Sequence, residues 1–205
     1  GAADAVVPEG ALPRPHPDDR RRGQQEAQRL VVGAVHHDLD QVVLLGDGTG
    51  RFGIAQNFNV GRVPGAVAVG DFNKDLKLDL VVTSAGKAAQ GILPDVTVLL
   101  GNGAGGFGAT SIPFSIPPTA VTVGDFNADG KPDLAVSCTE DTLTQNEIRV
   151  FLGDGSGRFG FASISPVAKN PVSIARGDFN GDLKPDLAVA NFTSGDVSVL
   201  LNQFD

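Results

Sequence analysis

The chain has 205 residues, is 41% hydrophobic and carries a formal net charge of −8, which excludes a disordered chain and disfavours non-specific binding to nucleic-acid phosphates. No apolar run approaches the roughly 20 residues that span a bilayer, so we expect no membrane insertion. The 27 Gly and 13 Pro favour short strands and tight turns, which makes an all-β fold the starting expectation.

The first 29 residues differ from the rest of the chain. They show no strand-like alternation and contain prolines at positions 8, 13, 15 and 17. We interpret residues 1–29 as a linker or disordered tail, and we expect the repeat region to span residues 30–205.

Residues 30–62 contain strand-like apolar runs but no acidic loop, so we expect an incomplete unit of three strands. Within them, the sequence HHDLD places His36 and His37 beside Asp38 and Asp40. These side chains are a candidate transition-metal or catalytic site, but neighbouring residues on a strand point to opposite faces, and we favour a loop between strands. The remaining histidine, at position 16, lies in the Pro-rich tail, so we expect no enzymatic activity.

Residues 63–115 form the first complete unit. Strand-like runs cover residues 66–72, 78–84, 95–101 and 106–114, with an acidic loop after the first run and a Gly-rich turn after the third. Four antiparallel strands in a repeat of this length are typical of a β-propeller blade. A parallel solenoid fits less well because its coils are shorter, and a plain series of hairpins is the remaining alternative.

The same unit recurs along the chain. GDFNKDLKLDLVV begins at Gly70, GDFNADGKPDLAV at Gly124 and GDFNGDLKPDLAV at Gly177, which gives spacings of 54 and 53 residues. A second motif occurs as VLLGDGTGRFG, VLLGNGAGGFG and VFLGDGSGRFG, beginning at positions 43, 98 and 150. Repeats of this size stack on their neighbours to bury their apolar faces. We therefore predict a β-propeller of four-stranded antiparallel blades over residues 30–62, 63–115, 116–168 and 169–205.

The predicted strands make about three and a half to four blades. The first blade lacks its first strand and the last blade lacks its fourth, so the two incomplete blades do not complement each other. Because exposed strand edges pair readily with other chains, we expect an open arc. Such an arc is either the remainder of a larger propeller or a homo-oligomer.

Several apolar residues follow the repeat. We expect six phenylalanines to pack between neighbouring blades; they are Phe52, Phe72, Phe107, Phe126, Phe159 and Phe179. The single cysteine, Cys138, lies in a strand-like apolar run and is expected to be buried. The chain has no Trp and no Tyr, which argues against a lectin formed by this chain alone.

Each GDFN segment opens a loop with oxygen-bearing side chains at positions 1, 3, 5 and 9 and a carbonyl at position 7. Ca²⁺ takes roughly six to eight oxygen ligands, whereas Mg²⁺ prefers a compact octahedron and retains its waters. Asp and Asn also favour turns through local hydrogen bonds, but this does not explain the same four positions in three loops. We therefore expect up to three Ca²⁺ sites, formed by Asp71, Asn73, Asp75, the Lys77 carbonyl and Asp79; by Asp125, Asn127, Asp129, the Lys131 carbonyl and Asp133; and by Asp178, Asn180, Asp182, the Lys184 carbonyl and Asp186.

Position 6 of the loop is Gly130 in the middle repeat but Leu76 and Leu183 in the outer repeats. Glycine adopts a positive φ at little cost, whereas a bulky residue there costs about 1 to 2 kcal/mol. Either the leucine loops take another turn with negative φ, or the strain is tolerated because the leucine packs against a neighbouring blade. In both cases we expect the two leucine loops to bind calcium no more tightly than the Gly130 loop.

The combination of the GDFNxDxKxDL segment with the LLGxGxGxFG segment resembles the FG-GAP repeat, also called the VCBS-type repeat, over residues 30–205. The resemblance implies blades around a central axis, with calcium in the loop between the first and second strands of a blade. Repeats of this kind occur in integrin α-subunits and in many secreted bacterial proteins, where they serve adhesion proteins, lectins and enzyme-attached domains.

We therefore expect a calcium-binding, non-catalytic repeat segment that serves extracellular binding, adhesion or protein interaction, with a protein or glycan ligand. Weak calcium sites would stay empty at cytosolic calcium concentrations, which favours a secreted, extracellular or periplasmic location. One alternative is a propeller domain attached to, or part of, a secreted carbohydrate-active enzyme or lectin. Another is a structural spacer domain.

Overall fold

The computed structural model describes residues 30–34, 40–45, 56–139 and 145–203. The expected tail over residues 1–29, all three histidines and Phe52 lie outside the described residues. None of the helices in the described part of the chain has the length and apolar character needed to cross a membrane.

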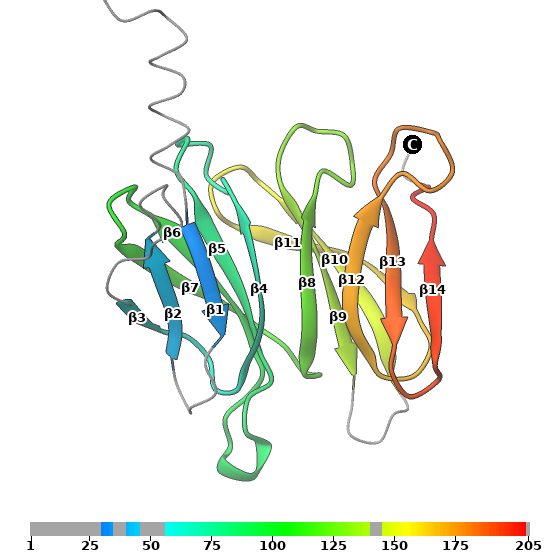
Figure 1. Ribbon diagram of the computed structural model, residues 1–205, viewed down its shortest axis with the longest axis horizontal. Coiled ribbons are helices and arrows are strands. Elements are labelled where there is room, and N and C mark those ends of the chain that lie inside the picture. Colours follow the sequence, from blue (N-terminus) through cyan, green and yellow to red (C-terminus); the bar gives the residue numbers. More distant parts are fainter. Residues whose placement is uncertain (1–29, 35–39, 46–55, 140–144, 204–205) are drawn as a thin grey trace, which may run out of the picture.

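The strands form four antiparallel sheets in chain order, which we number 1 to 4 (Figure 1). Sheet 1 contains β1 (Leu30–Ala34), β2 (Asp40–Leu45) and β3 (Gln56–Asn59), and sheet 2 contains β4 (Pro64–Gly70), β5 (Asp79–Ser84), β6 (Asp95–Gly101) and β7 (Phe107–Pro113). Sheet 3 contains β8 (Pro118–Gly124), β9 (Asp133–Thr139), β10 (Asn146–Gly153) and β11 (Phe159–Pro166), and sheet 4 contains β12 (Pro171–Gly177), β13 (Asp186–Asn191) and β14 (Asp196–Leu200). A short 3-10 helix, η1 (Ala88–Gln90), lies in the connection between β5 and β6.

The two middle sheets confirm the prediction of four antiparallel strands per repeat, and the first and last sheets have three strands each among the described residues. The sheets stand side by side: β1 contacts β4, β4 contacts β8, and β8 contacts β12. This arrangement is consistent with the blades of a propeller, although the described residues do not form a closed ring.

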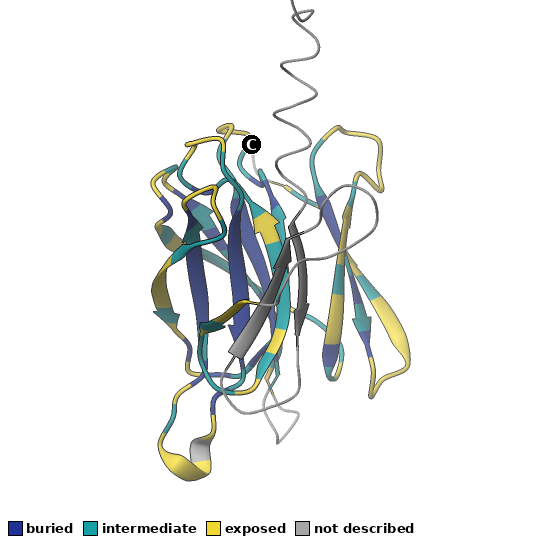
Figure 2. Cartoon of the chain, turned by 60° about the vertical axis from the view of Figure 1, so that its left-hand side comes forward, coloured by how far each residue is buried: buried dark blue, intermediate teal, exposed yellow. Residues whose placement is uncertain are grey.

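The second strands of sheets 2 and 3, β5 and β9, are buried on both faces, because a neighbouring sheet covers each side. In β5, Leu80 and Val82 pack in one cluster with Phe58 of sheet 1, whereas Val81 packs in another cluster with Leu134 of sheet 3. A strand buried on both faces carries a nearly continuous apolar run, which explains the sequence LVV at this point. Figure 2 shows these buried strands in the interior and the exposed residues in loops and on the outer strands.

The phenylalanines show where neighbouring sheets meet. Phe72 of the first acidic loop lies edge-on to Phe159 of sheet 3 at 5.4 Å between ring centroids, and Phe58 of sheet 1 lies edge-on to Phe107 of sheet 2 at 5.0 Å. Phe126 is also buried, but Phe179 is 50% exposed. The expectation that Phe179 packs between blades is therefore wrong, because no described sheet follows sheet 4.

Cys138 is fully buried in the core between sheets 2 and 3, as expected. Burial raises the pKa of its thiol to about 12. The thiol is therefore neutral at physiological pH and acts as a small apolar side chain.

Phe72 and Phe179 occupy the same loop position but differ in burial, which gives a matched test of the stacking. We expect Phe72→Ala to lower the free energy of unfolding by about 3 to 5 kcal/mol, because it empties a buried aromatic site. Phe179→Ala should cost less than about 1 kcal/mol, because half of its side chain is already in water. Urea denaturation of both variants checks the difference, and equal losses would contradict the stacking of sheet 3 on sheet 2.

Candidate functional site: the three acidic loops

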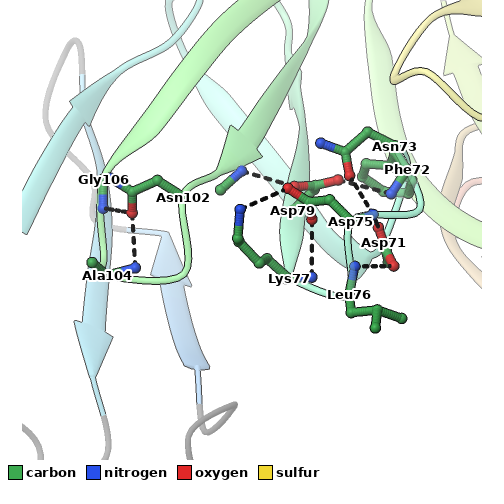
Figure 3. A network of polar contacts seen from close by, with 11 residues as sticks. Asp71, Phe72, Asn73, Asp75, Leu76, Lys77, Asp79, Asn102, Ala104 and Gly106 are labelled. Atoms are coloured by element: carbon green, nitrogen blue, oxygen red, sulfur yellow. Dashed lines mark hydrogen bonds and ion pairs between the residues drawn. The ribbon is translucent and has the colours of Figure 1, made fainter.

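The three acidic loops occupy equivalent places in sheets 2, 3 and 4. Each loop joins the first strand of its sheet to the second, and its position 9 aspartate is the first residue of the second strand. The five predicted donors of each set therefore belong to one loop and lie at one end of one sheet. Figure 3 shows the first loop.

In the first loop, the side chains at positions 1, 3 and 5 turn back onto the backbone (Figure 3). The Asp71 carboxylate accepts hydrogen bonds from the N–H groups of Asp75 (3.1 Å) and Leu76 (2.9 Å). The Asn73 oxygen also accepts from the Asp75 N–H at 3.1 Å. The Asp75 carboxylate accepts from the Lys77 N–H at 3.0 Å and forms an ion pair with the Lys77 ammonium, also at 3.0 Å.

The other two loops repeat this pattern. In the second loop, Asp125 accepts from the N–H of Gly130 at 2.8 Å, and Asp129 forms an ion pair with the Lys131 ammonium at 2.9 Å. In the third loop, Asp178 accepts from the N–H of Leu183 at 2.9 Å. There the Asp182 carboxylate accepts from the Asn180 side-chain amide at 3.1 Å.

The position 9 aspartates have a separate role that the sequence analysis did not foresee. Each is fully buried, and each carboxylate accepts two backbone N–H groups from different parts of its sheet. The first N–H belongs to the loop phenylalanine, and the second belongs to the last residue of the third strand in sheets 2 and 3 and to a residue two positions beyond it in sheet 4. The bonds are Phe72 N–H (2.8 Å) and Gly101 N–H (2.7 Å) to Asp79; Phe126 N–H (2.8 Å) and Gly153 N–H (2.8 Å) to Asp133; and Phe179 N–H (2.9 Å) and Asn202 N–H (2.8 Å) to Asp186.

This contact explains why the third strand of sheets 2 and 3 ends in glycine. A Cβ atom at Gly101 would collide with the Leu78 carbonyl oxygen, and one at Gly153 would collide with the Pro132 carbonyl oxygen. In sheets 2 and 3 this close approach to a loop carbonyl excludes larger residues, whereas Asn202 donates the equivalent N–H in sheet 4. In the sequence, this contact is marked by the aspartate at position 9 of the loop and by the glycine that ends the third strand.

The charges of each loop act on one another. Burial raises the pKa of the Asp79 carboxyl above its usual value, the two N–H bonds oppose this increase, and the negative charges of Asp75 and Asp71 add to it. The pKa of Asp133 is raised by the same causes in the second loop. Conversely, the hydrogen bond from Lys77 is the largest cause that lowers the pKa of Asp75. The first and second loops thus hold several carboxylates close enough to repel one another.

Both expectations for the leucines at position 6 are wrong. Leu76 and Leu183 have φ of 64° and 66°, so their loops do not adopt a turn with negative φ. Their side chains are 80% and 92% exposed, so packing against a neighbouring sheet does not offset the strain. The left-handed conformation instead brings the leucine N–H to the position 1 carboxylate, as it does for Gly130.

Position 4 is also left-handed, which the sequence analysis missed. Lys74, Ala128 and Gly181 have φ of 59°, 58° and 81°. The second and third loops therefore have one glycine at a left-handed position, whereas the first loop has none. Backbone strain should be greatest in the first loop.

The donor chemistry of the loops suits a hard cation, since all the predicted donors are oxygens. However, no group of three or more His, Cys, Asp or Glu side chains is placed to hold a metal ion within the residues that the structure describes. A carboxylate oxygen that accepts one N–H bond retains a second lone pair, so the observed bonds leave capacity for a cation.

The two hydrogen bonds that each buried carboxylate accepts lead to a mutational prediction. In the presence of a chelator, we expect Asp133→Asn to lower the free energy of unfolding by about 1 to 3 kcal/mol, because the amide NH₂ would face a backbone donor that loses its acceptor. The matched control is Asp154→Asn, since Asp154 is exposed in the β10–β11 turn. Chemical denaturation measures both, and an Asp133→Asn variant as stable as the control without metal would contradict a structural role.

The strain in the first loop leads to a second prediction. We expect Leu76→Gly to leave stability unchanged or to raise it by up to about 1 kcal/mol, because relief of the left-handed strain offsets the greater backbone entropy of glycine. Leu93→Gly is the control, since Leu93 is exposed and has no positive φ. Thermal denaturation compares the two variants, and a larger loss for Leu76→Gly would count against strain at this position.

Comparison with known families agrees with the repeat pattern. Residues 138–203 match the model of the FG-GAP-like repeat, and residues 117–137 match the model of the FG-GAP repeat. No curated protein matches the chain significantly. The two matched segments cover sheet 3 and sheet 4, including the loops of Asp133 and Asp186, and the same loop geometry recurs in sheet 2. Residues 117–203 of the chain therefore consist of FG-GAP-type repeats.

Proposed function

We propose that the chain is a calcium-binding, non-catalytic repeat domain of propeller type that binds other proteins outside the cytoplasm. The observation that carries this proposal is the threefold recurrence of one acidic loop with the same internal hydrogen bonds. FG-GAP-type repeats are generally non-catalytic and are typical of extracellular or secreted proteins.

The charge of the loops supports a cation at each one. Asp71 and Asp75 raise the pKa of the buried Asp79, so the three carboxylates repel one another. The Lys77 ammonium already lies on Asp75, which shows that a positive charge is favourable at this side chain. A calcium ion would supply two positive charges at the loop. Its ligands would be the carboxylates, the position 3 amide oxygen and the position 7 carbonyl of each loop, as predicted from the sequence.

The location follows from the expected affinity. Loops built from exposed side chains suit the range of extracellular calcium modules, with Kd of about 10⁻⁴ to 10⁻³ M. Sites of this affinity would fill in an extracellular or periplasmic setting and stay empty in the cytosol.

Two other functions remain as second candidates. The chain could form part of a secreted carbohydrate-active enzyme or lectin, or it could be a spacer between other domains. The exposed apolar side chains of sheet 4 favour protein binding over a spacer role, since Val197 and Val199 are 62% and 57% exposed, whereas their equivalents in sheet 2, Val96 and Val98, are buried.

Calcium removal tests the proposal. We expect the melting temperature to rise when calcium replaces chelator, because an ion at about 10 to 100 times its Kd stabilises the folded state by about 1.4 to 2.7 kcal/mol per site. Differential scanning calorimetry measures the shift, with magnesium as the comparison ion. An unchanged melting temperature at 10 mM calcium would contradict calcium binding.

A loop variant separates specific binding from a general salt effect. Asp129→Asn removes the position 5 carboxylate of the second loop, which is partly exposed and carries no core contact. We expect it to reduce the number of calcium ions bound by one in isothermal titration calorimetry. An unchanged stoichiometry would show that the second loop is not a calcium site.

A further inference from the structure

The Gly-rich turn between β6 and β7 contains a dipeptide with a chemistry of its own, Asn102 followed by Gly103. The chain contains one further Asn-Gly dipeptide, Asn180 and Gly181 in the third acidic loop. In such a dipeptide the glycine nitrogen can attack the side-chain amide of the asparagine, because glycine has no Cβ to crowd the ring that forms. The two identical dipeptides allow the effect of the fold on this reaction to be separated from that of the sequence.

The side-chain carbonyl of Asn102 is polarised by the turn around it (Figure 3). Its Oδ1 atom accepts hydrogen bonds from the N–H groups of Ala104 at 2.8 Å and Gly106 at 3.0 Å. Two N–H groups on one carbonyl oxygen stabilise the negative charge of a tetrahedral intermediate, and loss of one such donor in an enzyme slows the reaction by roughly 10² to 10³. The turn therefore favours attack on the Asn102 amide.

The attacking nitrogen is also accessible. Asn102 and Gly103 are both exposed, and within the described residues the Gly103 N–H donates to no protein acceptor. Its proton can therefore pass to a base in the solvent, as the attack on the side-chain amide requires.

The second dipeptide is held differently. The Gly181 N–H donates to the Asp178 carboxylate at 2.7 Å, and the Asn180 side-chain amide donates to the Asp182 carboxylate at 3.1 Å. Ring closure would break both of these bonds, and a hydrogen bond to a charged acceptor is among the stronger ones in proteins. The fold therefore protects Asn180 and leaves Asn102 reactive.

We propose that Asn102 is a self-modification site, at which the side-chain amide becomes a carboxylate without an enzyme. The Gly103 nitrogen loses its proton and bonds to Cγ of Asn102, the Cγ–Nδ2 bond breaks, and ammonia leaves with that proton. Water then opens the cyclic imide, at Cγ to give aspartate or at the backbone carbonyl to give isoaspartate. The net reaction consumes one water and releases one ammonia.

Sheet 3 shows that the fold accommodates the aspartate product. Asp154 occupies the position equivalent to Asn102, and its carboxylate accepts the N–H groups of Ser156 at 2.7 Å and Arg158 at 3.4 Å. These donors correspond to the two N–H groups that bond to Asn102. The product adds one negative charge to a turn that lies against the side chain of Lys77, beside the first acidic loop.

Peptide mapping by mass spectrometry tests the proposal on the full chain. After incubation in chelator at mildly alkaline pH, we expect Asn102 to be converted at least about tenfold faster than Asn180, because only Asn102 has two donors on its carbonyl oxygen and a free attacking nitrogen. The chelator excludes a cation in the third loop as the source of the difference. An intact Asn102, or conversion of Asn180 at an equal or higher rate, would overturn the proposal.

The same chain unfolded in urea is the control. There we expect Asn102 and Asn180 to be converted at similar rates, because the hydrogen bonds of both turns are lost. A ratio of rates that persists in urea would show that the neighbouring sequence and not the turn makes Asn102 reactive, and the proposal would be wrong.

Two variants test whether the turn accepts the product. We expect Asn102→Asp to melt at the same temperature as the unmodified chain, as the turn of Asp154 indicates. Asn102→Ala should melt at a lower temperature, because both N–H groups lose their acceptor. Equal losses in the two variants would contradict conversion to aspartate within the folded turn.

Discussion

The buried carboxylate at position 9 of each acidic loop is the contact on which the repeat depends. Asp79 accepts one N–H from the loop and one from the end of the third strand, so a single side chain joins three segments of its sheet. Hydrogen bonds to a charged acceptor stabilise a protein by about 1.5 to 3 kcal/mol each, and burial excludes competing water. The same bond sets the orientation of the loop phenylalanine, whose ring packs on the next sheet in the first two repeats.

The carbonyl of Phe72 also accepts the N–H of Gly157 in sheet 3 at 2.9 Å, and the carbonyl of Phe126 accepts the side-chain amide of Asn202 in sheet 4 at 2.9 Å. The loop therefore links the inside of one sheet to its neighbour.

The loop divides into an inner and an outer part. Its inner part, the position 9 carboxylate, is satisfied by backbone N–H groups. Its outer part, positions 1 and 3 to 7, is at least partly exposed and holds two left-handed positions in place through bonds to side-chain oxygens. Calcium, as we propose it, acts chiefly on the outer part, where the carboxylates repel one another. This division explains how Leu76 and Leu183 are tolerated: the φ value is required by the N–H bond to position 1, while the exposed side chain has no role in packing.

Much of the fold could be predicted because each repeat contains the same pattern of alternating strand residues and turn residues. The alternating runs and Gly-rich turns of residues 63–115 gave the strands of sheet 2 to within a few residues, and the repeat spacing extended them to sheets 3 and 4. The loop positions of the candidate donors were also clear.

The exposure of Phe179 could not be predicted from the repeat, because burial depends on what lies beyond the sheet and not on the motif. The left-handed conformation at Lys74 was hidden for a different reason: no glycine marks it, and only the hydrogen bonds of the folded loop require it. The two N–H bonds to each position 9 aspartate were missed because one donor lies about 20 residues away in the sequence.

The structure thus separates what holds a repeat together from what we propose binds to it. The buried carboxylates act within each sheet, and we propose that the outer parts of the acidic loops bind cations. Hydrogen exchange of the backbone amides in chelator, followed by NMR, tests the first part most directly. The account predicts that the N–H groups of Phe72, Gly101, Phe126 and Gly153 remain strongly protected without metal, because their acceptor is a buried carboxylate. If these amides exchange like exposed loop amides in chelator and become protected only when calcium is added, then the ion and not the carboxylate holds the repeat, and the account is wrong.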